Sequence, residues 1–240
     1  MSNTYPLRAV EKVISKLKKD PSYSIEINYS TRELLHIIIY RAGQILRGAV
    51  KKIKLGKTRG VVFCGGSVKI RHGYLIESRG NLILEDNVFL DALSENGIKL
   101  GSNVTIAKSS VLVCTGVIAK KGTGISIGDN SAVGAQSFLG GQGGIKIGND
   151  VIMGPGVRIF SENHNYSDPA LPIRKQGENR KGVVIEDNCW IGSGVTVLDG
   201  VRIGSGSVIA AGSVVTKDIP TDSIAAGVPA KVIKNRIIEK

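Results

Sequence analysis

The C-terminal half of the chain repeats a pattern of hydrophobic and polar positions every six residues. Between Ile185 and Pro220 six hexads follow one another without a break, and each opens with a branched aliphatic residue. The second place is mostly Gly, Ala or an acid, the next two are turn formers, and the fifth is small or β-branched. An amphipathic helix would place apolar residues every three or four positions, and an ordinary strand every second one. A period of six instead predicts one short strand and one turn per repeat, stacked as a β-solenoid.

The geometry of such a solenoid explains the pattern. The opening Ile or Val points inward and stacks on its equivalents in the coils above and below, which gives a continuous aliphatic core. Gly, Asn and Asp near the corners supply turn conformations that β-branched residues resist. Three hexads make one triangular coil. The period does not determine the handedness, and the general rule for parallel crossovers favours a right-handed coil.

The repeat is looser before the regular hexads begin. It starts near Val61, and insertions near 95–96 and 120–124 break its phase. The hexads then stop after Phe160 and resume only at Val184, and the polar, turn-rich residues between them contain His164. We expect a solenoid over 61–220 with an excursion loop at 161–183, followed by a short C-terminal tail at 221–240. A long loop inside a repeat array is either a tolerated insertion or a functional one.

Residues 1–60 have the pattern of a helical N-terminal arm. Apolar residues at helical spacing predict a helix over 6–19, and Ser30 with Glu33 forms a capping box that predicts the start of a second helix. In the second helix one broad apolar arc contains Leu34, Leu35, Ile38, Ala42, Ile45, Leu46, Ala49 and Ile53, and the opposite side carries Arg47, Lys51 and Lys54. We expect the apolar arc to cover the open end of the solenoid and the basic side to stay exposed.

Composition and charge add a second role for this arm. The chain of 240 residues has 31 Gly, 5% aromatic residues and a formal charge of +12, and residues 1–60 hold 13 Lys/Arg against 4 Asp/Glu. A basic arm is consistent with weak contact to an anionic membrane surface. Binding of nucleic acid is disfavoured, because no aromatic residues are interleaved for base stacking. The first 20 residues lack the apolar segment of a signal peptide, and no run near the start has membrane-spanning length.

The cysteines and two of the three histidines predict no special chemistry. Cys64, Cys114 and Cys189 have no metal-type spacing, so we expect small buried thiols in a reducing cytoplasm. His36 lies on the polar side of the second predicted helix and His72 at a corner of an early coil. We interpret both as structural or solvated, and we expect no metal site.

With these features together, the chain resembles the hexapeptide-repeat acyltransferases. The resemblance rests on the hexads, on the histidine-bearing loop and on the tail from Val214 to Pro220 and from Ala226 to Lys231. It is strongest to the bacterial sugar O-acetyltransferases, such as the maltose and galactoside acetyltransferases. Membership in this family implies a left-handed parallel β-helix, usually a homotrimer, with acetyl-CoA bound in the cleft between neighbouring subunits.

The resemblance also implies roles for individual residues. His164 matches the loop histidine that acts as general base, and imidazole suits this task because it titrates near neutral pH. Glu162 is a candidate to orient the imidazole. The positions that match the family's contacts to acetyl-CoA are Trp190 beside the pantetheine arm, Ser193 and Ala211 along that arm, Thr216 and Lys217 toward the nucleotide, and Lys231 and Lys234 near the phosphates. Lysine replaces arginine at the last two positions, which keeps the charge but loses the bidentate fork.

The sequence therefore predicts an acetyl-CoA-dependent O-acetyltransferase acting on a sugar hydroxyl, in surface polysaccharide or its lipid-linked precursor. It leaves open N-acetylation of an amino sugar or an antibiotic, and a non-catalytic β-helix scaffold. The zinc-dependent β-helix carbonic anhydrases are disfavoured, because their three histidines meet at one interface while these three are far apart in sequence. The expected location is the cytoplasm, with the membrane contact of the arm as an addition.

Overall fold

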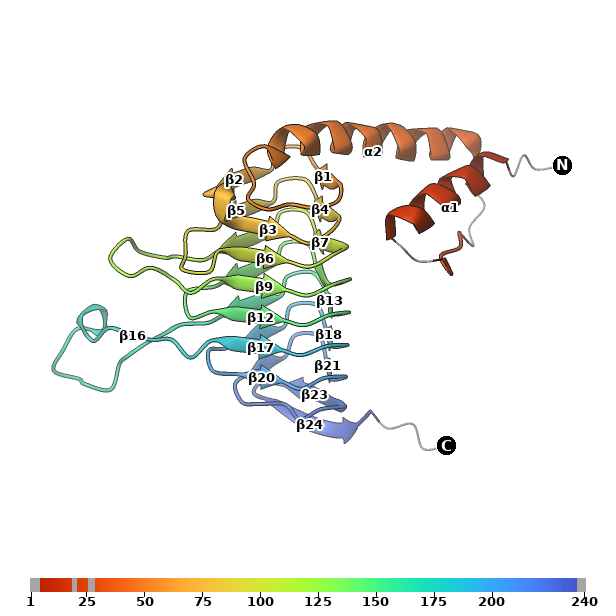
Figure 1. Cartoon of the computed structure of the whole chain (residues 1–240). Helices are drawn as coiled ribbons and strands as arrows, with labels where there is room; N and C mark the ends of the chain where they lie inside the picture. Colours follow the sequence, from red (N-terminus) through yellow and green to blue (C-terminus); the bar gives the residue numbers. More distant parts are fainter. Residues whose placement is uncertain (1–4, 19–20, 26–28, 237–240) are drawn as a thin grey trace.

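The computed structural model describes residues 5–18, 21–25 and 29–236 of the chain. It is a three-sided solenoid with helix α2 (Thr31–Lys52) across its N-terminal end and helix α1 (Tyr5–Lys18) beside α2 (Figure 1). Residues 1–4 and 26–28 of the predicted arm and 237–240 of the predicted tail lie outside the described residues, as do 19–20.

Each of the three faces of the solenoid is one sheet of short parallel strands. The β1 face contains β1 (Val62–Cys64), β4 (Leu82–Leu84), β7 (Val104–Ile106), β10 (Ala132–Val133), β13 (Ile152–Met153), β18 (Trp190–Ile191), β21 (Val208–Ile209), β23 (Ser223–Gly227) and the antiparallel β24 (Ala230–Asn235). The β2 face contains β2 (Lys69–Arg71), β5 (Phe89–Asp91), β8 (Val111–Val113), β11 (Phe138–Gly140), β14 (Arg158–Phe160), β19 (Thr196–Val197) and β22 (Val214–Val215). The β3 face contains β3 (Ile76–Ser78), β6 (Ile98–Leu100), β9 (Ile125–Ile127), β12 (Ile145–Ile147), β17 (Val183–Ile185) and β20 (Arg202–Ile203).

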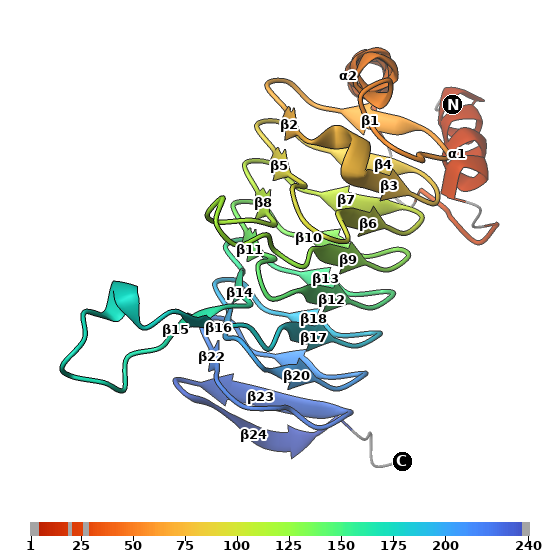
Figure 2. The ribbon, with the colours of Figure 1, turned by 60° about the vertical axis from the view of Figure 1, so that its left-hand side comes forward.

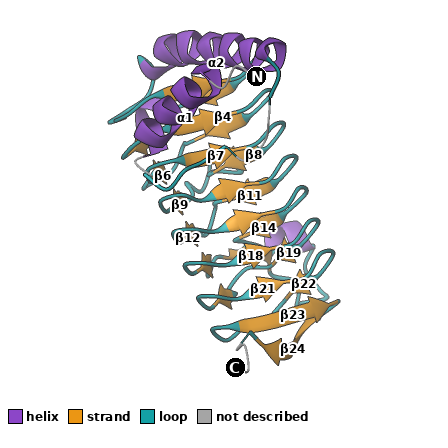
Figure 3. Cartoon of the chain, turned by 90° about the vertical axis from the view of Figure 1, so that its right-hand side faces the viewer, coloured by secondary structure: helices purple, strands orange, loops and turns teal. Residues whose placement is uncertain are grey.

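The chain visits the faces in the order β1, β2, β3 and winds as a left-handed coil. In Figure 1 the β3 face is nearest the viewer. The chain crosses this face from the side of the excursion to the opposite side, and each coil lies lower than the one before it. This is the left-handed sense. The family resemblance predicted this hand, and the general rule for parallel crossovers did not. Figure 3 labels β4, β7, β18 and β21 of the β1 face in this order down the solenoid, and β10 and β13 lie between β7 and β18 in the sheet.

The inward positions of the hexads form the core, as their spacing predicts. On the β3 face the inward column is Ile76, Ile98, Ile125, Ile145 and Val183, all of them buried. Each such side chain contributes about 1.5–3 kcal/mol relative to an exposed position. The alternate positions of the same strands point outward, so one strand of two or three residues serves both the core and the surface.

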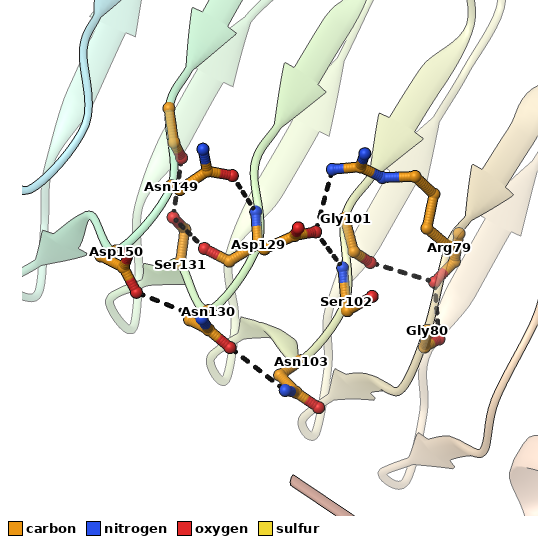
Figure 4. Close-up of polar contacts among 12 residues, drawn as sticks. Arg79, Gly80, Gly101, Ser102, Asn103, Asp129, Asn130, Ser131, Asn149 and Asp150 are labelled. Carbon is orange, nitrogen blue, oxygen red and sulfur yellow. Dashed lines mark hydrogen bonds and ion pairs between the residues drawn. The ribbon is translucent and has the colours of Figure 1, made fainter. Parts of the chain in front are cut away.

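The corners are built from residues that tolerate the left-handed backbone conformation. At the corner between the β3 and β1 faces, Asn103, Asn130 and Asp150 have φ of 57°, 56° and 55°. Their side chains form a ladder (Figure 4), in which Asn103 Nδ2 donates to Asn130 Oδ1 at 3.1 Å and Asn130 Nδ2 donates to Asp150 Oδ1 at 3.2 Å. Asn and Asp accept this conformation at low cost and replace lost backbone bonds with side-chain bonds.

Helix α2 begins as predicted and caps the first coil. Ser30 is its N-cap, and the capping box with Glu33 is complete. The side that packs on β1 has small and polar residues, Gln44 and Gly48, while Leu34 is buried nearer the start of the helix. The helix approaches the strand so closely that a Cβ at Gly48 would lie 1.7 Å from the carbonyl oxygen of Val62. Glycine is therefore required at this contact.

The predicted orientation of α2 is wrong. The apolar arc does not cover the solenoid, because Leu35, Leu46 and Ile53 are exposed. The contact is made instead from the other side of the helix, where Arg47 Nε donates to the carbonyl of Cys64 at 2.9 Å and Lys52 Nζ donates to that of Gly60 at 2.7 Å. The open edge of the first coil presents backbone acceptors that need donors. The basic side of α2 supplies these donors and an apolar arc does not.

Replacing Gly48 by alanine should destabilise the protein by about 1–3 kcal/mol, the usual cost of overpacking. The added methyl group meets backbone that cannot move away without separating α2 from β1. The matched control is Gly43→Ala in the same helix, where the new Cβ would meet only the end of the Arg47 side chain at 3.4 Å. Thermal unfolding followed by circular dichroism should show a lower midpoint for the first variant only. Equal midpoints would contradict the close contact.

Candidate active site

The predicted excursion is a hairpin that leaves the solenoid at the corner between the β2 and β3 faces (Figure 2). Its two strands, β15 (Asn163–His164) and β16 (Glu178–Asn179), are antiparallel, and His164 pairs directly with Glu178. Directly opposed residues in such a pair have Cβ atoms about 4.5–5.5 Å apart on one side of the ribbon. The hairpin therefore presents an exposed imidazole with a carboxylate beside it.

A network of charges holds the base of this hairpin. Arg180 Nε donates to Glu162 Oε2 at 2.7 Å, and its Nη1 donates to the carbonyl of Lys121 at 3.1 Å. Lys120 forms an ion pair of 2.9 Å with Glu178, which also lies 3.7 Å from Arg180. The hydrogen bond from Lys120 lowers the pKa of Glu178, so this carboxylate stays ionised. The network joins the excursion to the insertion of an earlier coil.

This network changes the role expected for Glu162. Its carboxylate binds Arg180, and no hydrogen bond between Glu162 and His164 is among the contacts of the described residues. Glu178 is instead the carboxylate paired with the histidine strand. Sequence reasoning missed Lys120, Glu178 and Arg180. The only signal was the break of the repeat at 120–124, which places an insertion next to the excursion.

The tip of the hairpin is ordered by one side chain. Gln176 Nε2 donates to the carbonyls of Asp168 and Leu171, and its Oε1 accepts from the backbone N–H of Asp168. Helix η2 (Ile173–Lys175) precedes it. Tyr166, Leu171 and Ile173 nevertheless expose much of their side chains. The tip thus carries an apolar surface that does not pack on its own chain.

Three of the residues predicted to contact acetyl-CoA lie together at the corner between the β1 and β2 faces. Trp190 is 57% exposed on β18, and Ser193 follows it at the corner. Ala211 takes the place of Ser193 in the next coil, where the backbone N–H of Gly212 donates to the Ser193 carbonyl at 2.8 Å. Both corner residues are exposed. The structure therefore brings these three residues into one surface strip.

The two C-terminal lysines lie further along the same face. Trp190 pairs with Val208, Val208 with Ile224, and Ile224 with Lys234, which gives a single outward column on the β1 face. At about 4.8 Å per strand, Lys234 lies roughly 14 Å from Trp190. Lys231 is on the same strand, β24, and is exposed. The column changes from apolar to cationic along its length.

The remaining predicted residues do not join this strip within one chain. Thr216 and Lys217 follow β22 at the corner between the β2 and β3 faces, and both are exposed. The hairpin of His164 leaves from the same corner, two coils earlier. Because this corner is the vertex opposite the β1 face, His164 and Trp190 lie on opposite sides of the solenoid. One chain does not bring them together.

A hollow of about 550 Å³ lies on the β3 face beside the base of the hairpin. Its polar lining includes Lys99, Lys146 and Lys181, with Ser126 and Thr123. Lys99, Ser126 and Lys146 occupy paired outward positions on neighbouring strands. The hollow is thus a cationic surface near the excursion.

The other candidate groups are placed as the sequence predicts. Cys64, Cys114 and Cys189 are buried free thiols, and burial raises the pKa of all three, that of Cys114 to about 12. His72 Nδ1 lies 2.8 Å from Asp91 Oδ1, and His36 is exposed on α2. Within 5–18, 21–25 and 29–236 no cluster of three potential metal ligands occurs. No helix in that part of the chain is long and apolar enough to span a membrane.

Comparison with known proteins adds to this geometry. A family profile described as bacterial transferase hexapeptide (six repeats) matches residues 182–217, and one described as hexapeptide repeat of succinyl-transferase matches 81–117 and 124–161. Galactoside O-acetyltransferase of Lactococcus lactis subsp. lactis (strain IL1403) is 51% identical over 37% of this chain and 42% of its own length. The putative lipopolysaccharide biosynthesis O-acetyl transferase WbbJ of Escherichia coli (strain K12) is 36% identical over 46% of this chain and 60% of its own length.

A solved structure shows the same fold. AntD, an N-acyltransferase from Bacillus cereus in complex with dTDP and 3-hydroxybutyryl-CoA, has a TM-score of 0.52 and 18% identity, and covers 79% of this chain and 87% of its own. The matches span only 42% to 60% of the two curated relatives. The repeat profiles and the named relatives nevertheless agree with the hexads and the parallel coils. Over residues 81–117, 124–161 and 182–217 the chain carries the hexapeptide repeats described for these transferases, and it is similar over part of its length to proteins named O-acetyltransferase.

Proposed function

We propose that the protein is an acetyltransferase that uses acetyl-CoA to acetylate a hydroxyl group of a saccharide. The observation that carries the proposal is the exposed His164 on a braced hairpin, with ionised Glu178 across the strand pair. The relatives named galactoside and lipopolysaccharide O-acetyltransferase support a saccharide acceptor. The cationic hollow beside the hairpin suits an acceptor that carries phosphate or carboxylate groups.

The outward column of the β1 face fits acetyl-CoA, which donates the acetyl group. Its apolar part at Trp190 suits the pantetheine arm of acetyl-CoA, and Lys234 at the far end suits a phosphate group. Ser193 and Ala211 keep the corner flat beside the tryptophan, because their side chains are small. When bound, the donor supplies the acetyl group as a reactive thioester.

The residues of the hairpin then take up the proton of the acceptor hydroxyl group. A hydroxyl group is a weak nucleophile until a base removes its proton, and His164 is the exposed base on the hairpin. The negative charge of Glu178 stabilises the imidazolium that forms. We infer direct transfer to the acceptor, because the raised pKa values of the buried thiols leave little thiolate for an acyl-enzyme.

The proposed site requires two copies of the chain. His164 and Trp190 lie on opposite sides of one solenoid, so a complete site forms only when the hairpin of one copy reaches the β1 face of its neighbour. A head-to-tail contact of this kind closes into a ring, and hexapeptide-repeat transferases are commonly trimers. Light scattering should give three times the chain mass of 25.4 kDa. A monomeric mass in active protein would refute the arrangement.

The other parts of the chain have supporting roles in this proposal. Residues 61–220 form the catalytic β-helix, while 1–60 and 221–240 serve as an arm and a tail. We place the enzyme in the cytoplasm, where acyl-CoA donors are made. Thr216 and Lys217 are proposed to contact the nucleotide of a donor bound mainly by the neighbouring copy.

The direct test is a transfer assay with purified protein, acetyl-CoA and a panel of sugars, read by release of the CoA thiol. Hydroxyl acceptors should be acetylated, and matched amino sugars should not be better substrates. Preference for amines would favour N-acetylation, which needs the base less because a neutral amine is already nucleophilic. Absence of acetyl-CoA binding by calorimetry would favour a non-catalytic scaffold.

A further inference from the structure

The outward side of α2 is an unusually apolar surface. We call it the outer stripe, and it consists of the exposed residues Leu35, Ile39, Leu46, Val50 and Ile53. Leu46 is 72% exposed and Ile53 is 84% exposed, although each is a large aliphatic residue. Continuous apolar surface of this kind on a helix marks a contact with a partner or a membrane.

The direction of the outer stripe follows from the helix geometry. At 3.6 residues per turn, its members fall within one arc, and the buried residues Leu34, Gln44 and Gly48 fall on the other side. Since the buried side rests on β1, the stripe points away from the solenoid end. Helix α2 lies across that end in Figure 1. In a ring of copies with parallel solenoids, all such stripes would face the same plane.

Two occupants fit an apolar stripe, a second copy of α2 or a lipid surface. The spacing of Leu35, Ile39, Leu46 and Ile53 also fits the seam of a coiled coil. The charges around the stripe decide between the two. Arg32 lies at one end of the stripe and Lys54, Lys57 and Arg59 follow its other end, all of them exposed, whereas Arg41, Arg47 and Lys52 form hydrogen bonds on other sides of the helix. Two such helices repel each other, whereas an anionic surface attracts them.

We propose that the outer stripe of α2 binds the surface of an anionic lipid bilayer, with the helix lying in the interfacial plane. The aliphatic side chains enter the boundary between headgroups and acyl chains, and the flanking lysines face anionic headgroups. Arg47 and Lys52 contribute less, because both already bind carbonyls of the first coils. The proposal stands without the transferase assignment, since it uses only α2 and the residues that follow it.

Sedimentation of the full-length protein with vesicles tests this proposal. Vesicles of phosphatidylglycerol with phosphatidylcholine should bind the protein at low salt, and phosphatidylcholine alone should bind it much more weakly. The double variant Leu46→Ser, Ile53→Ser should lower the partition coefficient at least tenfold. These side chains are exposed, so the helix signal and the unfolding midpoint should not change. The variant Lys54→Gln, Lys57→Gln should weaken binding and reduce its salt dependence.

The matched control is Ile118→Ser, which removes a 99% exposed isoleucine from the insertion between β8 and β9. It should bind vesicles as the unchanged protein does. The proposal is overturned if the unchanged protein ignores anionic vesicles, or if the double serine variant binds them equally well. It is also overturned if light scattering shows that assemblies pair through α2 and that the same two serines separate them, because a second copy would then cover the stripe.

Discussion

Replacing His164 by alanine should lower the rate of acetyl transfer about 10²–10⁴-fold, which is the usual contribution of a general base. The variant keeps the hairpin, because the ion pairs of Lys120, Glu178 and Arg180 do not involve the imidazole. Binding of acetyl-CoA should be nearly unchanged, since the surface strip of Trp190, Ser193 and Ala211, where acetyl-CoA is proposed to bind, lies on the other side of the solenoid. The measurements are steady-state thiol release and calorimetric titration with CoA.

The control for this variant is His36→Ala. His36 is an exposed histidine on α2, away from the hairpin, and its loss should leave the rate unchanged. Retention of more than a tenth of the activity by the His164 variant would exclude a role as general base. Loss of CoA binding together with activity would show a structural effect instead.

Replacing Ala211 by tryptophan should lower kcat/KM for acetyl-CoA about 100-fold or more. The residue is exposed at the corner beside Ser193, so the large ring does not enter the core. It fills the strip along which the pantetheine arm of acetyl-CoA is proposed to lie, so acetyl-CoA should bind there much more weakly, and each loss of about 1.4 kcal/mol of binding free energy is a tenfold loss of affinity. Kinetics at varied acetyl-CoA concentration should show most of the loss in KM.

Lys108→Trp is the matched control for the blocked strip. Lys108 is exposed at the same corner, and backbone hydrogen bonds relate it through successive coils to Ala135, Pro155, Ser193 and Ala211. It lies four coils, roughly 19 Å, from Ala211. A tryptophan there should change neither kinetic constant. If both tryptophans inhibited equally, the donor would not lie along this part of the corner.

The fold was largely predictable, because the six-residue period of the sequence corresponds to one short strand and one turn of a three-sided solenoid. Ile185, Ile191 and Val197 open successive hexads, and each is buried on a different face of the coil. The corner residues could likewise be anticipated, since few side chains tolerate the left-handed conformation found at Asn103 and Asn130. The handedness came from family resemblance, because a period alone does not distinguish the two coils.

The orientation of α2 was not predictable from its own pattern. An apolar arc predicts the side of a helix that seeks burial. Whether the protein itself buries that side depends on the surface opposite, and the first coil offers carbonyls of Gly60 and Cys64 rather than an apolar groove. Gly48 shows the same limit, because its close approach to Val62 is a tertiary property. No feature of the helix sequence encodes either partner.

The sequence pointed to some residues of the candidate site and not to their arrangement. His164 stands out as a histidine in a long polar loop, and Trp190 as the single tryptophan. Glu178 and Arg180 do not stand out, since their partners, Lys120 and Glu162, lie 18 or more residues away with no periodic relation. The separation of His164 from Trp190 becomes visible only when the hexads are wound into three faces.

The central claim is that each site joins His164 of one copy to the Trp190 strip of its neighbour, and mixed assemblies test it most directly. The variants His164→Ala and Ala211→Trp, each expected to keep about a hundredth or less of the activity at acetyl-CoA concentrations well below KM, would be produced together with different affinity tags, purified through both and assayed under that condition. Every mixed trimer then contains one intact pair among its three contacts, so we expect about a third of the unmodified activity. Mixed assemblies as inactive as their parents would show that each site lies within a single chain, and would contradict the account.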